Sequence, residues 1–306
     1  MGKRRSGAGS QRFRHLVEYW LLLLFGFFLR SFSYRVNLKI ANLLGKVGFG
    51  LLRIRRKVTL DNLRMVFANQ KTENEIKKIA LQSYCNMARG FIEHLIFPAL
   101  SKEKILANLE FENLHYLDEI IKHGKGGILV SSHFGSWQIG GTSVRLAGYP
   151  MNFLVQRQNN HLVEDLVYSY VEDKGVKVLY KSVSAGKIFE LLRSNQIVAV
   201  LPDQDAGKSG VIVNFMGQPA STHKGPAFFS LKTGAPIIIA LSLNEQNGQH
   251  RVVMEKPIYP HPTGKRDEDI KHLTQIYTSK IEEYIRKYPD HWFWQHRRWK
   301  STLNIY

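Results

Sequence analysis

From residue 127 to residue 254, short apolar runs alternate with longer helical patterns, and this alternation restricts the possible folds more than any other feature. Such an order predicts an α/β fold with a mixed, mostly parallel sheet flanked by helices. With 306 residues, of which 44% are hydrophobic, the chain can bury a large core. The strand-like runs lie at 127–131, 151–155, 176–179, 197–201, 211–215, 236–243 and 251–254, and the helical patterns at 137–147, 161–174, 185–194, 224–233 and 267–287.

The first 100 residues lack this alternation and are mostly helical in pattern. Helical stretches cover 12–45, 61–68 and 72–97, whereas residues 1–9 are expected to form a disordered basic tail. The sequence therefore predicts two parts. Residues 1–50 comprise the basic tail and a membrane-associated helix, and residues 51–306 form the α/β domain with a helical lead-in.

An almost purely apolar run at 17–29 lies inside the first helical pattern. It is shorter than the roughly 20 residues that span a bilayer. A signal peptide, with its basic start and apolar middle, is the weaker alternative, because the bulky, charged segment 30–35 that follows offers no small-residue cleavage site. We expect a helix that inserts partway into the membrane or tilts in it, or that packs on the rest of the protein. The flanking cations place the protein on the cytoplasmic side of the membrane.

The formal net charge of +18 is concentrated near the N-terminus, where residues 1–60 hold thirteen Lys or Arg and one acid, Glu18. Such asymmetry indicates a polyanionic partner, either nucleic acid or anionic lipid. The adjacent apolar run favours an anionic membrane surface, and no recognition helix or stacking platform indicates nucleic-acid binding. A single cysteine, Cys85, excludes an internal disulfide framework and zinc sites built on several cysteines.

A histidine follows the first strand-like run of the alternating region. The segment 131–141, Ser-Ser-His-Phe-Gly-Ser-Trp-Gln-Ile-Gly-Gly, places His133 at the carboxyl edge of the sheet and beside a helix start. Open α/β sheets bind their ligands at this edge. A neutral imidazole there can accept the proton of a hydroxyl, so His133 is the candidate general base. A structural histidine satisfied by nearby backbone is the alternative.

Two carboxylates follow the strand-like run at 197–201. Asp203 and Asp205 flank Gln204, and either acid can orient His133 or fix a substrate hydroxyl. A local turn stabilised by Asp side chains is the alternative. An Asp-x-Asp pair can also hold Mg²⁺, but no further acidic cluster supports a metal site.

Three other polar segments are candidates for substrate contacts. Arg157 follows the run at 151–155 and can clamp a phosphate or polarise a carbonyl. Thr222 and Lys224 lie in segment 221–227, which opens a helical pattern, and free N–H groups at a helix start favour an anion; a plain helix cap is the alternative. The aromatic and basic segment 291–300, which contains Arg297, is expected to pack under the active site or against a membrane.

Taken in order, these motifs resemble the bacterial lipid A biosynthesis (lauroyl/myristoyl) acyltransferase family of the glycerolipid acyltransferase superfamily, whose signature is a His, four residues, then Asp or Glu. The resemblance covers nearly the whole chain, and related mannoside acyltransferases share the pattern. It rests on segment 133–138, Arg157, segment 203–205, segment 221–227 and segment 294–298.

The resemblance implies a glycerolipid acyltransferase-like fold with a helical N-terminal membrane anchor at the cytoplasmic face of the inner membrane. It implies transfer of a fatty acyl group from acyl carrier protein or coenzyme A to a glycolipid hydroxyl, without a cofactor or a metal. His133 would take the proton of the acceptor, and Arg157 or backbone N–H groups would stabilise the oxyanion. The expected catalytic group is His133, Gln138, Asp203 and Asp205, and the expected substrate contacts are Ser132, Trp137, Arg157, Gln204, Thr222, Lys224 and Arg297.

The chain departs from the family signature at Gln138, where the family has an acid. A Gln carbonyl can fix the tautomer of His133 but brings no charge. Neutralising the orienting acid of serine proteases costs about 10⁴ in rate. Three hypotheses follow: Asp203 or Asp205 supplies the charge, the chemistry tolerates a slower step, or the protein is an inactive relative that only binds lipid.

Overall fold

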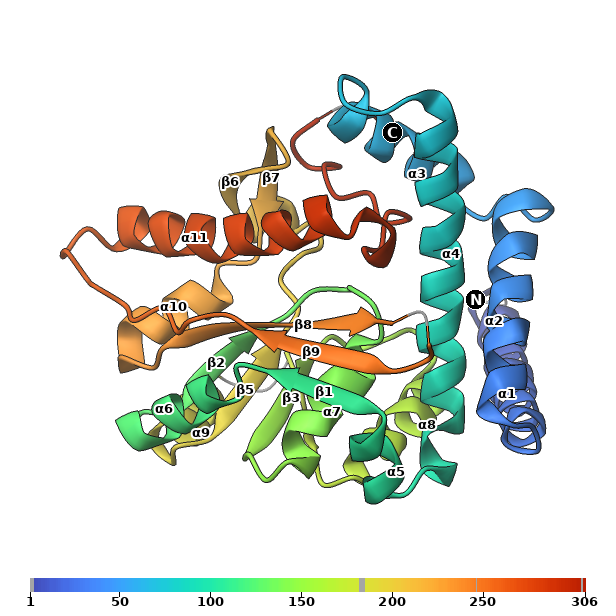
Figure 1. The fold of residues 1–306 in the computed structure, drawn as a ribbon, viewed down its shortest axis with the longest axis horizontal. Helices are drawn as coiled ribbons and strands as arrows, with labels where there is room; N and C mark the ends of the chain where they lie inside the picture. Colours follow the sequence, from blue (N-terminus) through green and yellow to red (C-terminus); the bar gives the residue numbers. More distant parts are fainter. Residues whose placement is uncertain (1–2, 182–184, 246, 304) are drawn as a thin grey trace.

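The computed structural model describes residues 3–181, 185–245, 247–303 and 305–306. Within these ranges the chain forms a seven-stranded sheet of order β1-β9-β8-β2-β5-β3-β4, with a separate antiparallel hairpin, β6-β7 (Figure 1). Every neighbouring pair in the large sheet is parallel except β8 and β9. The strands are β1 (Leu109–Glu112), β2 (Gly127–Val130), β3 (Met151–Val155), β4 (Lys177–Tyr180), β5 (Ile197–Val200), β6 (Val211–Phe215), β7 (Gln218–Thr222), β8 (Ile237–Asn244) and β9 (His250–Met254).

Helices cover both faces of the sheet, so the α/β fold with a mixed, mostly parallel sheet is confirmed. The helices are α1 (Lys3–Arg30), α2 (Tyr34–Gly50), α3 (Arg56–Phe67), α4 (Glu73–Ile96), α5 (Lys102–Ala107), α6 (His115–His123), α7 (Trp137–Leu146), α8 (His161–Glu172), α9 (Ala185–Arg193), α10 (Gly225–Thr233) and α11 (Arg266–Lys287).

Strand β2 lies in the middle of the sheet, and all its residues are buried. Because side chains alternate along a strand, Ile128 and Val130 join the larger core, which includes residues of α9, α10 and α11. Leu129 points to the opposite face and packs with Leu117 of α6 and Val144 of α7. Because both faces of a central strand are covered, its residues form a continuous apolar run in the sequence, as they do at 127–130.

Helices α1 and α2 lie beside α4, outside the α/β core (Figure 1). The expected helical region is interrupted at 31–33, where the Ser33 hydroxyl accepts the N–H of Val36 and starts α2. Gly45 allows close packing, because a Cβ there would lie 2.5 Å from the Cα of Cys85 on α4. The predicted disordered tail was wrong over residues 3–9, where α1 already begins; residues 1–2 lie outside the described residues.

Across the described residues, no helix has both the length and the apolar character required to cross a bilayer.

Candidate active site

His133 and Asp203 come from neighbouring parallel strands of the central sheet. His133 follows β2, and Asp203 follows β5, which pairs with β2 in register from Gly127 opposite Ile197. The ladder continues for one bond beyond the strands, from the N–H of Ser131 to the carbonyl of Val200. Both side chains therefore leave the same edge of the sheet, and Nδ1 of His133 lies 2.8 Å from Oδ1 of Asp203.

The Asp203 carboxylate is buried and receives four hydrogen bonds from the described residues. Oδ1 accepts from the His133 imidazole, and Oδ2 accepts from the Ser132 hydroxyl, the His133 backbone N–H and the indole N–H of Trp292. Burial alone would raise the pKa of Asp203, yet attraction to the His133 ring in its protonated form and these hydrogen bonds hold the pKa of Asp203 well below its usual range. Since an ionised carboxylate can only accept, the proton of a neutral His133 ring resides on Nδ1.

The other ring nitrogen of His133 is left as the basic one. Nε2 lies 3.3 Å from the side-chain amide nitrogen of Gln204, which can donate to it. The Trp137 and Phe293 rings lie 5.1 and 6.1 Å from the imidazole, centre to centre. The His133 side chain remains 21% exposed, compared with 2% for Asp203. The basic nitrogen is thus accessible while the carboxylate is sealed.

A cavity of about 620 Å³ adjoins His133. Its inner part lies between α7 and the sheet and is lined by small or apolar residues, and its other part is polar. The inner lining includes Leu129, Gly140, Gly141, Val144, Phe153, Ala199, Ala240 and Val252. The polar lining includes Ser131, Gln138, Gln156, Arg157, Lys181, Gln204 and His223. A ligand with a long apolar chain and a polar head fits this division.

Gln138 and Asp205 occupy different surroundings from Asp203. Gln138 lines the cavity, and no hydrogen bond joins it to His133 among the described residues. The Asp205 carboxylate accepts from the Ser301 hydroxyl, and its backbone N–H donates to Nε2 of His296. Asp203 and Asp205 therefore face different partners, and the described residues hold no cluster of acids, His or Cys suited to a metal ion.

Of the remaining predicted substrate contacts, Arg157 lies at the cavity. It is held by Glu164, 3.2 Å from Nη1, and by the Tyr180 ring, whose centre is 3.6 Å from the guanidinium carbon. Lys224 and Arg297 are exposed and do not line the cavity. Lys224 is the N-cap residue of α10, and the guanidinium carbon of Arg297 lies 6.0 Å from the centre of the Tyr306 ring.

Thr222 is the last residue of β7 and is buried, so the segment that sequence analysis placed at a helix start is a strand end there. Its hydroxyl accepts from Arg298, which also donates to the Ser221 carbonyl and, over 3.4 Å, to the Gln204 carbonyl. Burial lowers the pKa of the Arg298 guanidinium to about 10, which leaves it charged at neutral pH. Arg298, not Arg297, thus braces the loop that carries Gln204.

Comparison with known proteins decides which family these features belong to. The model of the bacterial lipid A biosynthesis acyltransferases matches residues 7–301. The chain belongs to this family. The resemblance inferred from the ordered motifs is therefore confirmed, and the protein is an acyltransferase.

Curated relatives of this acyltransferase act on two kinds of lipid. The phosphatidylinositol mannoside acyltransferase of Mycobacterium tuberculosis (strain CDC 1551 / Oshkosh) is 25% identical over 231 residues, which are 74% of this chain and 70% of that protein. The lipid A biosynthesis palmitoleoyltransferase of Escherichia coli (strain K12) is 23% identical over 303 residues, 95% and 94% of the two chains. The lauroyltransferase of the same strain is 21% identical over 261 residues, 84% and 83%.

The acyltransferase builds its site partly from a segment that sequence reasoning did not resolve. Trp292 donates to Asp203 although 89 positions separate them, and Trp292, Trp294 and Trp299 are all buried. The aromatic composition of 291–300 was the available signal. Of the two placements expected for this segment, the structure shows packing under the active site. Lys181 at the cavity gave no comparable signal, and His223 lies within segment 221–227, from which only Thr222 and Lys224 were predicted as contacts.

Proposed function

We propose that this acyltransferase moves a fatty acyl group from an acyl thioester, carried by acyl carrier protein or coenzyme A, to a hydroxyl of a glycolipid such as a lipid A precursor. The observation that best supports this function is the His133–Asp203 pair. Its basic nitrogen, Nε2 of His133, is open to a cavity with an apolar inner end. The names of the relatives support a glycolipid acceptor. The fatty chain would occupy the space between α7 and the sheet.

The proposed chemistry needs one proton acceptor and no acyl-enzyme intermediate. The acceptor hydroxyl takes the place of the Gln204 amide at Nε2 of His133 and gives up its proton as its oxygen attacks the thioester carbonyl. The C–S bond then breaks, the new C–O ester bond remains, and the imidazolium returns the proton to the leaving thiolate. Asp203 stabilises the imidazolium because it is ionised, buried and 2.8 Å from Nδ1.

The oxyanion of the tetrahedral intermediate needs a donor in the polar part of the cavity. Arg157 is the cation placed there by a fixed geometry, since Glu164 and Tyr180 hold its guanidinium from two sides. Gln204 is the second donor, because its amide is freed when the acceptor hydroxyl displaces it from His133. Both groups are assigned to positioning and charge stabilisation.

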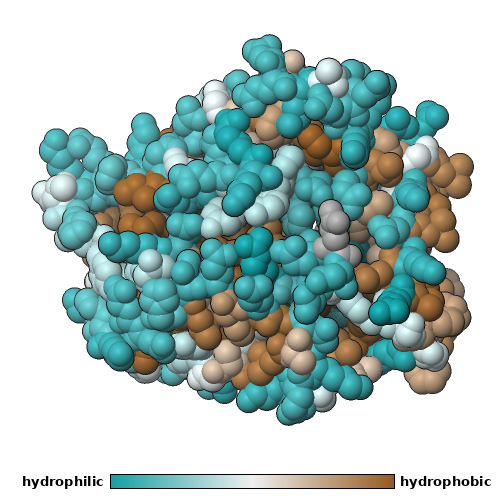
Figure 2. Space-filling model, in the orientation of Figure 1, coloured by the Kyte–Doolittle hydropathy of each residue, from teal (hydrophilic) through white to brown (hydrophobic). Residues whose placement is uncertain are grey.

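The same proposal places the enzyme on the cytoplasmic face of the inner membrane. Among the described residues, fifteen of the nineteen exposed large apolar side chains lie between residues 13 and 54. They gather over α1 and α2, at the right edge of Figure 2. Cations in the same region suit anionic headgroups and, near the site, an acidic carrier protein.

Purified enzyme in anionic lipid vesicles tests the reaction directly. The vesicles contain either an underacylated lipid A precursor or a phosphatidylinositol mannoside, and the donor is the palmitoyl or lauroyl thioester of acyl carrier protein or of coenzyme A. Mass spectrometry is expected to show one added acyl group on one acceptor, and His133→Ala is expected to abolish it while thermal unfolding is unchanged.

The same assay separates the enzyme from an inactive relative, which Gln138 makes the second candidate. An inactive relative would bind glycolipid vesicles without adding an acyl group to either acceptor from any of these donors. Lipid mass spectrometry of cells with and without the gene gives an independent answer. Equal turnover by wild type and His133→Ala would remove the general-base role.

A further inference from the structure

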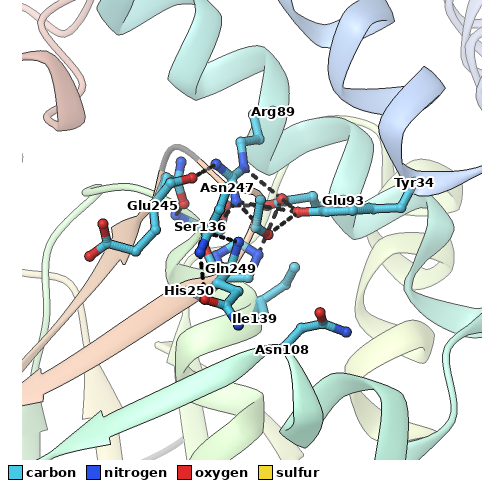
Figure 3. Close-up of polar contacts among 12 residues, drawn as sticks. Tyr34, Arg89, Glu93, Asn108, Ser136, Ile139, Glu245, Asn247, Gln249 and His250 are labelled. Carbon is cyan, nitrogen blue, oxygen red and sulfur yellow. Dashed lines mark hydrogen bonds and ion pairs between the residues drawn. The ribbon is translucent and has the colours of Figure 1, made fainter.

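Another buried carboxylate, Glu93 of α4, lies under the segment that connects His133 to α7. Its side chain is 2% exposed and is surrounded by Tyr34, Arg89, Ser136 and His250 (Figure 3). Burial would raise its pKa, but the charges of His250 and Arg89 and the hydrogen bond from Ser136 hold the pKa of Glu93 well below its usual range. Glu93 is therefore an ionised acceptor inside the protein.

The two oxygens of Glu93 have different partners. Oε1 accepts from Arg89, 2.7 Å away, and from the Tyr34 hydroxyl of α2, and lies 3.2 Å from Nε2 of His250 on β9. These groups join α2, α4 and the sheet. Oε2 accepts from the hydroxyl of Ser136, which is 1% exposed. One oxygen thus holds the scaffold together, and the other holds the turn next to His133.

Ser136 uses its hydroxyl for Glu93 although it occupies the N-cap position of α7. Its side chain makes no capping bond, whereas serine at this position normally accepts one from the helix backbone. Its own N–H donates to Oδ1 of Asn244 on β8, 3.2 Å away. The next residue is Trp137, whose ring faces His133. Ser136 therefore fixes the junction between the general base and the start of α7.

The other residues of this turn, His133 and Gly135, are held by contacts with β8 and with the segment 291–293. Gly135 has φ +55°, and a Cβ there would lie 2.1 Å from the carbonyl oxygen of Ser242, so the turn rests directly on β8. The Gly135 N–H donates to the His291 carbonyl, and the His133 carbonyl accepts from Phe293. On the α4 side, the turn is held by the charge-assisted hydrogen bond from Ser136 to Glu93.

We propose that Glu93 is a positioning residue for acyl transfer, which it serves by holding the turn of His133 and Trp137 through Ser136. This inference rests on the proposed function, since it needs His133 to be the general base. Loss of the Ser136 bond would let the turn shift while Asp203 still contacts the ring. A shift of about 1 Å at a reacting group can cost about 10² in rate.

Two substitutions that each remove one hydrogen bond from Glu93 test the proposal. Ser136→Ala frees Oε2, and Tyr34→Phe frees Oε1 from its bond with α2. Ser136→Ala is expected to lower kcat by about 10- to 100-fold with KM for the thioester within about threefold. Tyr34→Phe is expected to keep kcat within about twofold of wild type. The melting temperatures of both Ser136→Ala and Tyr34→Phe are expected to fall, because each variant loses a buried hydrogen bond.

A double-mutant cycle adds the carboxylate itself. If Glu93 acts through Ser136, Ser136→Ala lowers kcat much less in a Glu93→Gln background than in wild type. Additive losses of kcat, or equal losses of kcat in Ser136→Ala and Tyr34→Phe, would overturn the proposal and leave Glu93 with a scaffold role. Should Glu93→Gln fail to fold, the comparison of Ser136→Ala with Tyr34→Phe still decides.

His133→Ala in the same assay keeps this test separate from that of the proposed function. If His133→Ala retains turnover, the general-base assignment fails. If His133→Ala is inactive but Ser136→Ala keeps wild-type kcat, only the positioning role of Glu93 fails. Circular dichroism and melting temperature of every variant show that losses of rate are not losses of folded protein.

Discussion

At the residue scale, the acid that orients His133 comes from the end of a neighbouring strand and not from the helix position at which the family signature places an acid. Gln138 stands at the signature position on α7 and lines the cavity, whereas Asp203 at the end of β5 contacts Nδ1. The carboxylate is buried, and each of its oxygens accepts a hydrogen bond. A buried, ionised carboxylate interacts strongly with an imidazolium, so the missing charge at Gln138 need not slow the reaction.

Replacing Asp203 by Asn is therefore expected to lower kcat by about 10²–10⁴, because the amide stabilises no imidazolium and can favour the wrong tautomer. Asp205→Asn is the matched control and should leave kcat nearly unchanged, since its carboxylate faces Ser301. Adding Gln138→Glu to Asp203→Asn should restore part of the rate by returning an acid to the cavity. Steady-state kinetics at saturating donor measure all three, and a large loss in Asp205→Asn alone would reverse the assignment.

The sequence predicts part of this residue arrangement. Two strands that run parallel end at one edge, so His133 and the segment 203–205 were expected together. The choice between Asp203 and Asp205 depends on how the chain turns after Pro202, which spacing does not reveal. Trp292 and Arg298 reach the site only through tertiary packing, because their bonds to Asp203 and Ser221 cross 89 and 77 positions of sequence.

At the element scale, small residues on α7 and on the facing strands leave room for a chain. Gly140 and Gly141 on α7 and Ala199 and Ala240 on β5 and β8 line the inner cavity. Periodicity identified α7, β5 and β8 as elements, but it did not show that their facing positions would be small. Strand β1, helix α6 and strand β7 were not predicted, because β1 is short and half-exposed and the segment of β7 contains a proline.

Ala199→Leu is expected to fill part of this inner space and to shift donor preference toward shorter acyl chains. Each buried methylene contributes about 0.8 kcal/mol, so excluding two or three should lower kcat/KM for palmitoyl relative to octanoyl thioesters by about tenfold or more. Val198→Leu is the matched control, since Val198 lies on the same strand and packs in the core on the opposite face. An unchanged palmitoyl-to-octanoyl ratio in Ala199→Leu would place the acyl chain elsewhere.

At the scale of the whole molecule, histidines that are buried or half-buried make the folded state sensitive to acid. Burial lowers the pKa of His94 to about 4, below the value of about 6.5 of an unfolded chain. Burial also lowers the pKa of His223 and of His296 to about 4. Between about pH 4 and pH 6.5, these histidines therefore bind protons in the unfolded chain but not in the folded chain. The free energy of unfolding should therefore fall as pH falls from about 6.5 to 4.

His94 offers the cleanest test of this pH dependence, because it is buried between α4 and α8 and bonded to the Val167 carbonyl. His94→Gln should reduce the slope of unfolding free energy against pH by up to about 1.4 kcal/mol per pH unit in this window. His115→Gln, at an exposed position, is the control and should leave the slope unchanged. Urea titrations from pH 4 to 7 measure the slopes; identical slopes for His94→Gln and wild type would contradict the expectation.

The two N-terminal helices give the molecule one side on which apolar and basic groups lie together, and the active-site turn is tied to that side through Tyr34 and Glu93. If this side rests on the bilayer, replacing Leu24 and Phe27 together by Gln should weaken binding to anionic vesicles by at least about tenfold, because each apolar side chain contributes about 1.5–3 kcal/mol on burial. Ile212→Gln, a comparably exposed position on the β6–β7 hairpin, should have no effect. Vesicle co-sedimentation at low and high salt separates the apolar contribution from that of the cations, since only the latter is screened. Undiminished sedimentation of the double variant at high salt would contradict the proposal that this side of the molecule binds the bilayer.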